Sequence, residues 1–404
     1  DIRDRLVAND LFTKDTTLNT PYITNYSENL NMRATLEPIK YLSINITAIK
    51  NQTWSNREYF RYNGSEFTSY TPITTGSFSM SIISTKTSFA KNAKDFSNKN
   101  FQMLLDIRPD IAVMVAQRSP VWNGAFVTDS ISGILYPDGY GPTSQNVLIP
   151  AFLAAYTGHN PEKYVKSIFP SIPLPNWRIS YTGLNKINLF KKYFSSATLT
   201  HGYTSNYTVG SFANNPLFSD PDKDGYTTVR DALHNFLPQY EISQVSISEN
   251  FNPILGIQLN WINSLVTTLD WKKSRNVALN TSNVQITEIN TNEWVIGIGY
   301  RFKDLSFDIR TGGQTKTIKS DLNLKADLSI RDNITILRRI VEEINQVSAG
   351  QKVISINLSA DYQFSKNITL RAFFDQIINN PHVASQYYNT STNFGISIRF
   401  SLAM

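Results

Sequence analysis

T-N-F-G-I-S-I-R-F-S-L, residues 392–402, decides the fold of this chain. Apolar and polar side chains alternate through all of it. The apolar set is Phe394, Ile396, Ile398, Phe400 and Leu402, and the polar set is Asn393, Gly395, Ser397, Arg399 and Ser401. Only a β-strand has a side-chain period of two, so each set lines one face of a sheet. Such persistent alternation is typical of a membrane β-barrel, in which lipid contacts one face and water the other.

The same alternation recurs along the chain and predicts about a dozen antiparallel strands. We expect strands at 24–36, 42–60, 75–90, 177–187, 196–210, 254–262, 264–281, 284–303, 320–333, 352–364, 366–378 and 392–402. The segment 334–345 (ITILRRIVEEIN) fits a helix and also the continuation of a long strand, so both interpretations stay open.

A soluble β-sandwich also alternates, but three features favour a membrane barrel. The strands are long, aromatic residues collect near their ends, and tight turns alternate with long polar loops. We therefore expect one set of side chains to face lipid and the other to face the lumen. The lipid set is Ile356, Leu358, Ile398 and Phe400, and the lumen set is Asn357, Ser359 and Arg399.

Composition narrows the class of protein. Of 404 residues, 17% are charged and 12% are aromatic, an unusual pairing for a cytosolic enzyme. No run of eighteen apolar residues exists, which excludes transmembrane helices. Cysteine is absent, which excludes disulfides and zinc–thiolate sites. The net charge of +6 is spread singly, so nucleic acid is not an expected partner. The chain begins at Asp1 without a signal peptide, so we expect a mature product or a piece of something longer.

Residues 91–175 interrupt the strand pattern and predict a partly helical insertion. Residues 145–157 have helical spacing, with Gly158 where a C-terminal cap is expected. Asn160-Pro161-Glu162 then predicts the start of a second helix that runs through Phe169. The insertion could plug the lumen, cap the outside of the barrel, or decorate it without a role in transport.

The connections predict which end of each strand faces the periplasm. Tight connections at 37–42, 262–264 and 365–367 are typical of the periplasmic side, and long ones at 211–253 and 379–391 of the cell surface. Counting back from a periplasmic C-terminus agrees with this assignment as far as residue 177. Further back it conflicts with the turn at 37–42, so one strand is missed, two are merged, or that turn is misplaced.

The loop 211–253 contains an acidic pattern that predicts a calcium site. Its spacing matches a calcium loop, with ligands expected from Asp220, Asp222, Asp224, the carbonyl of Tyr226, and Asp231. Gly225 permits the sharp turn, and a helix is expected at 229–236. The alternative is an acidic surface turn, because Asp and Gly are ordinary turn residues. A bound Ca²⁺ would be structural.

The sequence predicts no catalytic site. The four histidines have no metal-binding spacing, and no nucleophile-elbow motif exists. His201, with Ser205 and Asn206 nearby, has a faint likeness to an outer-membrane lipase, but polar residues are common on any barrel strand. We therefore do not expect an enzyme.

Several long segments resemble one family. They are V-L-I-P-A-F-L-A-A-Y-T-G (147–158), P-L-P-N-W-R-I-S-Y-T-G-L (173–184), S-D-L-N-L-K-A-D-L-S-I-R-D-N (320–333), S-A-G-Q-K-V-I-S-I-N (348–357) and N-F-G-I-S-I-R-F (393–400). They resemble the C-terminal region of the SprA family, also called Sov, the giant outer-membrane translocons of the type IX secretion system of Bacteroidota. The resemblance runs across nearly the whole chain and is clearest from about residue 145 onward.

The resemblance implies that the chain is the closing part of a very large outer-membrane barrel. It implies export of folded proteins, including gliding adhesins, with secreted cargo, a PorV-type barrel and a periplasmic plug protein as partners. It supplies no catalytic residue and no calcium site. Two alternatives stay open, a self-contained outer-membrane porin or hydrolase barrel and a soluble β-sandwich adhesin. If the chain is part of a translocon, it should not close into a barrel by itself, whereas a self-contained barrel would.

Overall fold

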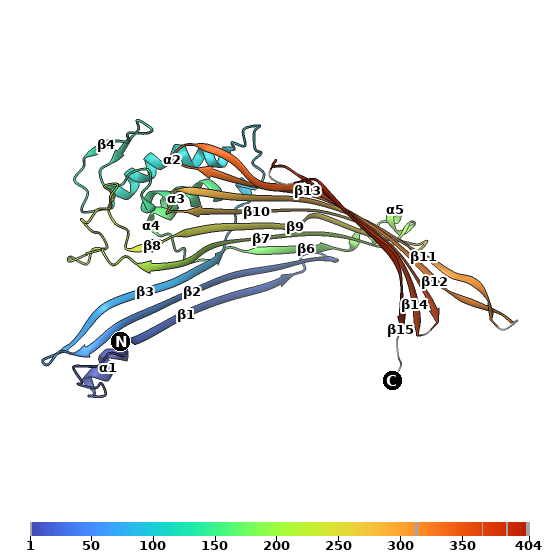
Figure 1. The fold of residues 1–404 in the computed structure, drawn as a ribbon, viewed down its shortest axis with the longest axis horizontal. Coiled ribbons are helices and arrows are strands. Elements are labelled where there is room, and N and C mark those ends of the chain that lie inside the picture. Colours follow the sequence, from blue (N-terminus) through green and yellow to red (C-terminus); the bar gives the residue numbers. More distant parts are fainter. Residues whose placement is uncertain (1, 312–313, 366, 385–386, 401–404) are drawn as a thin grey trace.

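The computed structural model describes residues 2–311, 314–365, 367–384 and 387–400. One antiparallel sheet of thirteen strands dominates it, with the order β1-β2-β3-β7-β9-β10-β11-β12-β13-β14-β15 and with β6 and β8 beside that path (Figure 1). The prediction of an all-β antiparallel sheet of about a dozen strands with a helical insertion is confirmed.

The strands of this sheet are long. They are β1 (Tyr22–Leu36), β2 (Leu42–Tyr62), β3 (Phe67–Ser81), β6 (Asn176–Tyr181), β7 (Phe194–Asn214), β8 (Tyr240–Ile242), β9 (Gln244–Trp261), β10 (Leu265–Asn280), β11 (Gln285–Thr311), β12 (Gln314–Arg339), β13 (Ile344–Ser365), β14 (Ile368–Pro381) and β15 (Asn389–Phe400). A separate pair consists of β4 (Phe126–Thr128) and β5 (Leu135–Pro137).

The helices are few and mostly short. They are α1 (Ile2–Ala8), α2 (Lys99–Ala116), α3 (Gln145–Thr157), α4 (Glu162–Lys166) and α5 (Asn188–Lys191), with 3-10 turns at Thr85–Thr87 and Gly183–Lys186. Within the described part of the chain, no helix has both the length and the apolar character needed to cross a membrane.

Strands β3 and β6 form a single line in the sheet, and this explains the conflict in the strand count. Both pair with β2, with Met80 opposite Lys50 and Asn176 opposite Thr47. The chain leaves this line after Ser81 and returns to it at Asn176. The expected strands 75–90 and 177–187 are therefore two parts of one position in the sheet. The turn at 37–42 lies at the same end of the sheet as the turn at 262–264, as the tight turns require, and its side of the membrane stays a prediction.

Some boundaries differ from the predictions. Residues 85–87 are a 3-10 turn instead of the end of a strand, because the chain has already left the sheet. In 334–345 the strand continues to Arg339 and a turn precedes Ile344, so the helical alternative was wrong. The long loop is 215–239, because β7 and β9 extend into the ends of the predicted range 211–253. In the last predicted strand, residues 401–402 lie outside the described part.

The insertion, residues 82–175, contains more helix than expected. Helix α3 has the predicted bounds, and Gly158 ends it with φ +70°. The second predicted helix is only α4, which ends at Lys166 because Pro170 follows shortly and extended backbone begins at Ser167. Helix α2 was missed: its Pro109 interrupts the pattern, although Asn98 caps its N-terminus by accepting a hydrogen bond from Phe101 N.

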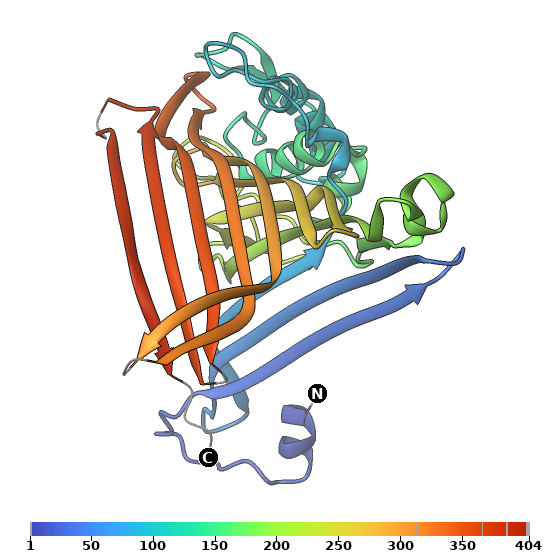
Figure 2. The ribbon, with the colours of Figure 1, turned by 90° about the vertical axis from the view of Figure 1, so that its right-hand side faces the viewer.

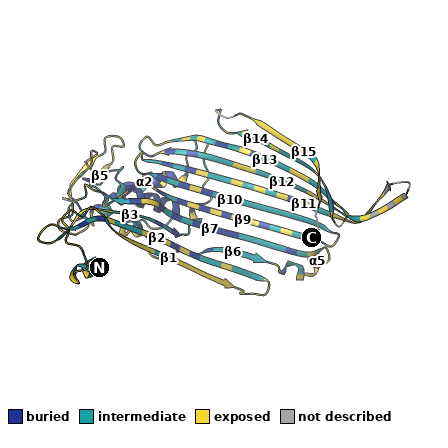
Figure 3. Cartoon of the chain, turned by 60° about the horizontal axis from the view of Figure 1, so that its bottom comes forward, coloured by how far each residue is buried: buried dark blue, intermediate teal, exposed yellow. Residues whose placement is uncertain are grey.

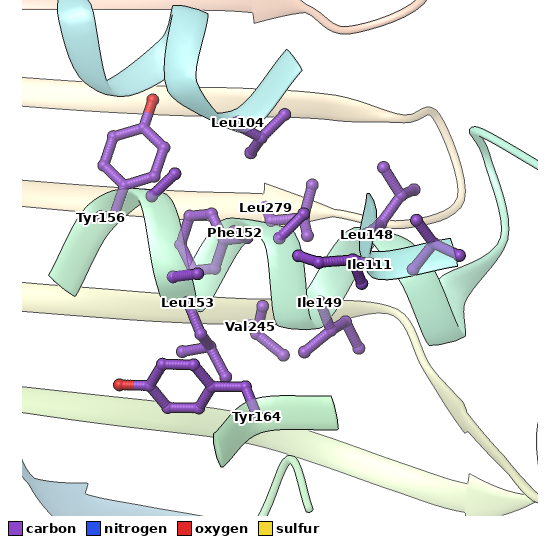
Figure 4. Packing of buried hydrophobic residues seen from close by; sticks show 14 of the residues in the cluster. Leu104, Ile111, Leu148, Ile149, Phe152, Leu153, Tyr156, Tyr164, Val245 and Leu279 are labelled. Atoms are coloured by element: carbon purple, nitrogen blue, oxygen red, sulfur yellow. The ribbon is translucent and has the colours of Figure 1, made fainter. Parts of the chain in front are cut away.

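The core lies where the insertion packs on the sheet. Phe152, Leu153 and Leu148 of α3 lie over Val245 and Leu279 of the strands (Figure 4). Every residue of α3 from Val147 to Thr157 is buried, which explains why this helix is apolar on all sides. Buried positions concentrate at this end of the sheet, whereas β1 and β15 are mostly exposed (Figure 3).

Candidate membrane-facing surface

The sheet has one apolar face that crosses many strands in register. Directly paired residues give an uninterrupted row, Leu199–Ile257–Leu269–Ile296–Leu328–Ile356, across β7, β9, β10, β11, β12 and β13. Two further rows continue to β15, Ile298–Ala326–Leu358–Phe374–Phe394 and Tyr300–Leu324–Ala360–Ala372–Ile396. We call these three rows the apolar band. Ile298 is 50% exposed and Ile396 is 77% exposed, so these side chains lack a cover in the described structure.

The opposite face is polar in the same strands. The row one residue away is Thr198–Gln258–Thr268–Gly297–Asp327–Asn357–Asp375–Asn393. Ion pairs join neighbouring strands or positions on this face, with Lys325 Nζ 2.9 Å from Asp327 Oδ2 and Arg371 Nε 3.7 Å from Asp361 Oδ1. The predicted division of 356–359 and 398–400 into two faces is confirmed; contact of one face with lipid stays a prediction.

Gly297 is needed because the polar face is crowded at this point. A Cβ atom there would clash with Thr268 Oγ1 and would lie 2.8 Å from Asp327 Oδ1. The glycine therefore admits two polar side chains from the neighbouring strands.

The apolar band lies within a longer stretch of the sheet whose length is that expected of a membrane-spanning strand. On β7, one border is Phe194 beside α5, and the other is Tyr203, which contacts the insertion through Ser84. That stretch spans about 30 Å along the strand at about 3.3 Å per residue. A barrel tilt of about 40° would reduce it to about 23 Å, close to the ~25 Å apolar belt of outer-membrane barrels.

Aromatic residues mark both borders. Trp271 and Trp294 stack with ring centroids 5.1 Å apart near the insertion, and Tyr300 and Phe302 contact at 4.6 Å toward the opposite end. Trp261 lies at that opposite end, where its indole N–H donates to Thr267 at 3.1 Å. Aromatic girdles at two levels are typical of membrane barrels.

The insertion sits on the apolar face, beyond one border of the band. The residues that it covers, such as Val277, Leu279 and Ile286, belong to the same alternating set as Leu269 and Ile296, because the register of β10 with β11 is unbroken. The polar face is left uncovered by this packing. A plug in the lumen would have to lie on the polar face, which is the face expected to line the lumen. The insertion packs on the apolar face, so this placement disagrees with a plug.

Two buried ion pairs fix the insertion to the sheet. In the first, Glu249 accepts hydrogen bonds from Ser84 Oγ and Ser88 Oγ, both 2.6 Å, and lies 3.2 Å from Arg275. Arg275 also donates to the carbonyl of Thr87 at 2.9 Å. Each charge thus has a charged partner and further hydrogen bonds, which a buried ion requires.

The second pair joins β11 and β12. Arg338 Nε donates to Glu288 at 2.8 Å, and its other nitrogens donate to Asn92 and to the carbonyl of Phe96. Sequence reasoning missed both pairs. The available signal was a charge at a position where alternation predicts an apolar residue, as for Arg275 between Trp271 and Val277.

The predicted calcium ligands do not converge in this structure. Asp220 accepts hydrogen bonds from the amides of Asp224 and Gly225 at 3.1 and 2.9 Å, and Asp224 accepts one from Tyr226 N. Asp222 has no described contact that brings it to the others, and Asp231 caps Leu233 N and Asn235 N. Among the residues that the structure describes, no three His, Asp or Glu side chains are grouped to hold a metal ion.

The prediction of a helix at 229–236 is wrong. Arg230 and Phe236 instead form an isolated antiparallel bridge, closed by the hydrogen bonds that Asp231 accepts. The Asp231 carboxylate competes for backbone amides and stabilises a turn in place of a helix. Calcium binding by this loop stays a prediction.

An ion pair holds the loop 215–239 against the insertion. Both terminal nitrogens of Arg230 donate to Asp138, at 2.6 and 2.7 Å. These hydrogen bonds hold the pKa of Asp138 below its usual value. The Arg230 guanidinium also lies 4.6 Å from the ring centre of Phe236.

The faint lipase grouping is not assembled. His201 Nδ1 contacts the carbonyl of Ile254 at 2.6 Å, whereas Ser205 Oγ contacts Ser84 Oγ at 3.0 Å. Asn206 bonds to Ser79 and Thr208. The three residues therefore have separate structural partners.

Comparisons with known proteins do not identify a family for this chain. No family model and no curated protein matches this sequence. The solved structures that resemble it include two of in-vitro folded OmpT, an outer membrane protein of Vibrio cholerae. The trimer form has 8% identity over 95% of this chain and 99% of that chain, and the other has 9% identity over 94% and 97%, each with a TM-score of 0.24. A likeness at this TM-score carries no argument.

Proposed function

We propose that this chain forms part of the wall of an outer-membrane β-barrel that conducts proteins. The observation that carries the proposal is the pairing of an apolar row with a polar row in the same six strands, from Leu199 to Ile356 and from Thr198 to Asn357. In water, the exposed apolar band would be an aggregation hazard. In a bilayer, it is the surface that lipid requires.

The open edges support a larger assembly. In the described residues, β1 pairs with β2 alone and β15 with β14 alone, so both edges offer unpaired backbone groups. Unpaired groups at membrane depth cost several kcal/mol each, so further strands must cover them. A wall of many strands encloses a wide lumen, because barrel diameter grows with strand number.

The finer assignment is a translocon of the type IX secretion system, with a role in gliding motility. The resemblance of five long segments to the SprA family supports it. Secreted folded cargo, a PorV-type barrel and a periplasmic plug protein are the partners proposed on that basis. The polar face, which the insertion leaves uncovered, would line the path of the cargo. On this assignment the protein lies in the outer membrane of a Bacteroidota bacterium. It would act by opening and closing a pore and by exchanging partners, without covalent catalysis.

Cysteine scanning of residues 354–360 in the assembled protein tests the membrane placement. The chain has no native cysteine, so each label is specific. We expect a lipid-soluble thiol reagent to label positions 356, 358 and 360, and an aqueous reagent to label 355, 357 and 359. Labelling without a two-residue period would contradict the barrel wall and favour the soluble β-sandwich.

Two further measurements separate a translocon from a self-contained porin or hydrolase barrel. A bulky aqueous reagent on Asn357→Cys should slow export of folded cargo, whereas a lipid-soluble reagent on Leu358→Cys should not. The isolated 1–404 chain should aggregate in detergent and give no uniform conductance. A heat-modifiable monomer with one reproducible conductance would favour the self-contained barrel.

A further inference from the structure

The connection between β6 and β7 combines lysines with exposed apolar side chains. Its sequence at 186–193 is K-I-N-L-F-K-K-Y, and α5 occupies the middle of it. Leu189 is 69% exposed, Ile187 49% and Tyr193 48%. Lys186, Lys191 and Lys192 are also exposed. A turn that only faces water needs no large apolar side chains, so this composition calls for a partner.

Neighbouring turns extend the same surface. The ammonium groups of Lys40 and Lys186 lie 5.2 and 5.6 Å from the ring centre of Tyr41. The amide of Ile262, whose residue is 61% exposed, donates to the carbonyl of Tyr193 at 3.1 Å. We call Lys40, Tyr41, Lys186, Ile187, Leu189, Lys191, Lys192, Tyr193 and Ile262 the basic–apolar cluster.

The charge of this cluster is not neutralised internally. Within the described part of the chain, none of its four ammonium groups lies within ion-pair distance of a carboxylate. Glu37 is the one acidic residue of the turns 37–41 and 182–193. Four positive charges therefore remain available to an anionic partner.

The cluster lies at the border of the apolar band. Phe190 of α5 contacts Phe194, and Phe194 contacts Trp261, with ring centroids 5.8 and 4.4 Å apart. The indole of Trp261 bonds to Thr267, which belongs to the same face as Leu269. Segment α5 projects from the sheet (Figure 2), and these contacts connect it to the apolar face. The insertion marks the other border, about 30 Å away along β7.

We propose that the basic–apolar cluster binds the headgroups of anionic phospholipids in the leaflet at the tight-turn end of the sheet. The proposal rests on the membrane placement given above. Leu189, Ile187 and Tyr193 would enter the interfacial region, and the lysine stems would lie along it while their ammonium groups contact lipid phosphates. The cluster thus fixes the depth of the wall in the bilayer and selects anionic lipid around it.

Photocrosslinking in the assembled protein tests this directly. Leu189 is replaced by benzoylphenylalanine, membranes are irradiated, and the attached lipids are identified by mass spectrometry. Phospholipid adducts are expected, with the anionic class enriched over its share of the membrane by about fivefold or more, the preference that one lysine near an anionic surface provides. Enrichment should fall in the variant Lys186→Gln, Lys191→Gln, Lys192→Gln, in which Lys40 is the one cluster lysine that remains.

Matched controls separate this proposal from the membrane placement itself. The variant Lys91→Gln, Lys94→Gln, Lys99→Gln removes the same charge from exposed positions of the insertion and should keep the enrichment. The probe at Leu358, within the band, should give lipid adducts. The probe at Leu217 in the loop 215–239, which is as exposed as Leu189, should give none.

The outcomes are distinct. Lipid adducts at Leu358 with none at Leu189, or with adducts at Leu189 that match the bulk lipid composition, would overturn the proposed headgroup site alone. No lipid adducts at Leu358 would overturn the membrane placement as well.

Discussion

Ser81 and Leu174 are joined by two hydrogen bonds although they are 93 residues apart. The Leu174 amide donates to the Ser81 carbonyl at 2.9 Å, and Ser81 Oγ donates to the Leu174 carbonyl at 2.7 Å. Ser81 Oγ also accepts from Ile49 N of the neighbouring strand at 3.0 Å. One side chain thus closes the gap where the insertion leaves and re-enters the line of β3 and β6.

Ser81→Ala should loosen this closure. Ser81 is 1% exposed, so the Ile49 amide and the Leu174 carbonyl would lose partners that water cannot easily replace, at a cost of about 1–3 kcal/mol. Hydrogen exchange at Ile49 and around Leu174 measures it. The matched control is Ser77→Ala on the same strand, whose exposed hydroxyl contacts Thr53 and whose loss should change little. Equal exchange in both variants would contradict a closing role for Ser81.

Arginine substitutions should distinguish the two faces. Leu358→Arg places a charge in the apolar band and should cost about 2–4 kcal/mol of stability in the membrane. Asn357→Arg, one residue away on the polar face, should be mild. Temperature-dependent unfolding of the assembled protein, followed by gel mobility, measures the difference. Similar losses in both variants would argue against a lipid-facing band.

Arg275→Met should release the insertion. The substitution leaves Glu249 buried without its ionic partner, a loss that typically costs about 3–5 kcal/mol. Faster tryptic cleavage at Lys86, Lys91 and Lys94 is the expected readout. The double variant Glu249→Gln, Arg275→Met should recover part of the stability, because no uncompensated charge remains. Unchanged cleavage in Arg275→Met would mean that other contacts suffice to hold the insertion.

Docking of the loop 215–239 on the insertion should weaken in acid. The pKa of Asp138 is lowered in the folded state, so its contribution is complete above its unfolded pKa of about 3.9 and is lost as pH falls through the lower folded value. The pair is partly exposed, so it contributes at most about 1 kcal/mol. The distance between spin labels on Ser132→Cys and Leu217→Cys should lengthen below about pH 4. In Asp138→Asn it should be long at every pH.

Calcium binding by the loop can be tested by proteolysis. If Ca²⁺ occupies Asp220, Asp222, Asp224, Tyr226 and Asp231, cleavage after Lys223 should be slower with Ca²⁺ than with EDTA. Asp220→Asn with Asp224→Asn should abolish the difference, because carboxylate charge is what the ion requires. Equal rates in the unmodified chain would identify Asp220 as the cap of an ordinary turn, consistent with its hydrogen bonds to Asp224 N and Gly225 N.

Local patterns predicted the strands well because alternation is a property of each strand by itself. In residues 352–364 and 392–400 the alternation of apolar and polar side chains identifies the two faces without knowledge of the adjacent strands. Helix α3 was predicted for the same reason, since Gly158 marks its end locally. The missed features all depend on distant partners. The split of the β3 line depends on Ser81 meeting Leu174, and the role of Arg275 depends on Glu249 and Thr87.

The loop 211–253 shows the opposite failure. Its acidic spacing is a local pattern, yet local patterns with Asp and Gly serve turns as readily as ions. Asp220 and Asp231 each accept two backbone amides instead of meeting each other. The spacing of the carboxylates is the same whether they bind an ion or accept hydrogen bonds from backbone amides, so it does not distinguish the two.

The ion pairs that hold the insertion also impose an order of assembly. The hydrogen bond from Ser84 to Glu249 joins residues 165 positions apart in the sequence, and the one from Arg338 to the carbonyl of Phe96 joins residues 242 positions apart. Contacts over such separations form slowly, because a long loop must close before the contact is gained. The insertion is synthesised early but can dock only after β9 to β12 are in place. Its docking is therefore a late step of folding, and a docked insertion reports that this part of the wall is complete.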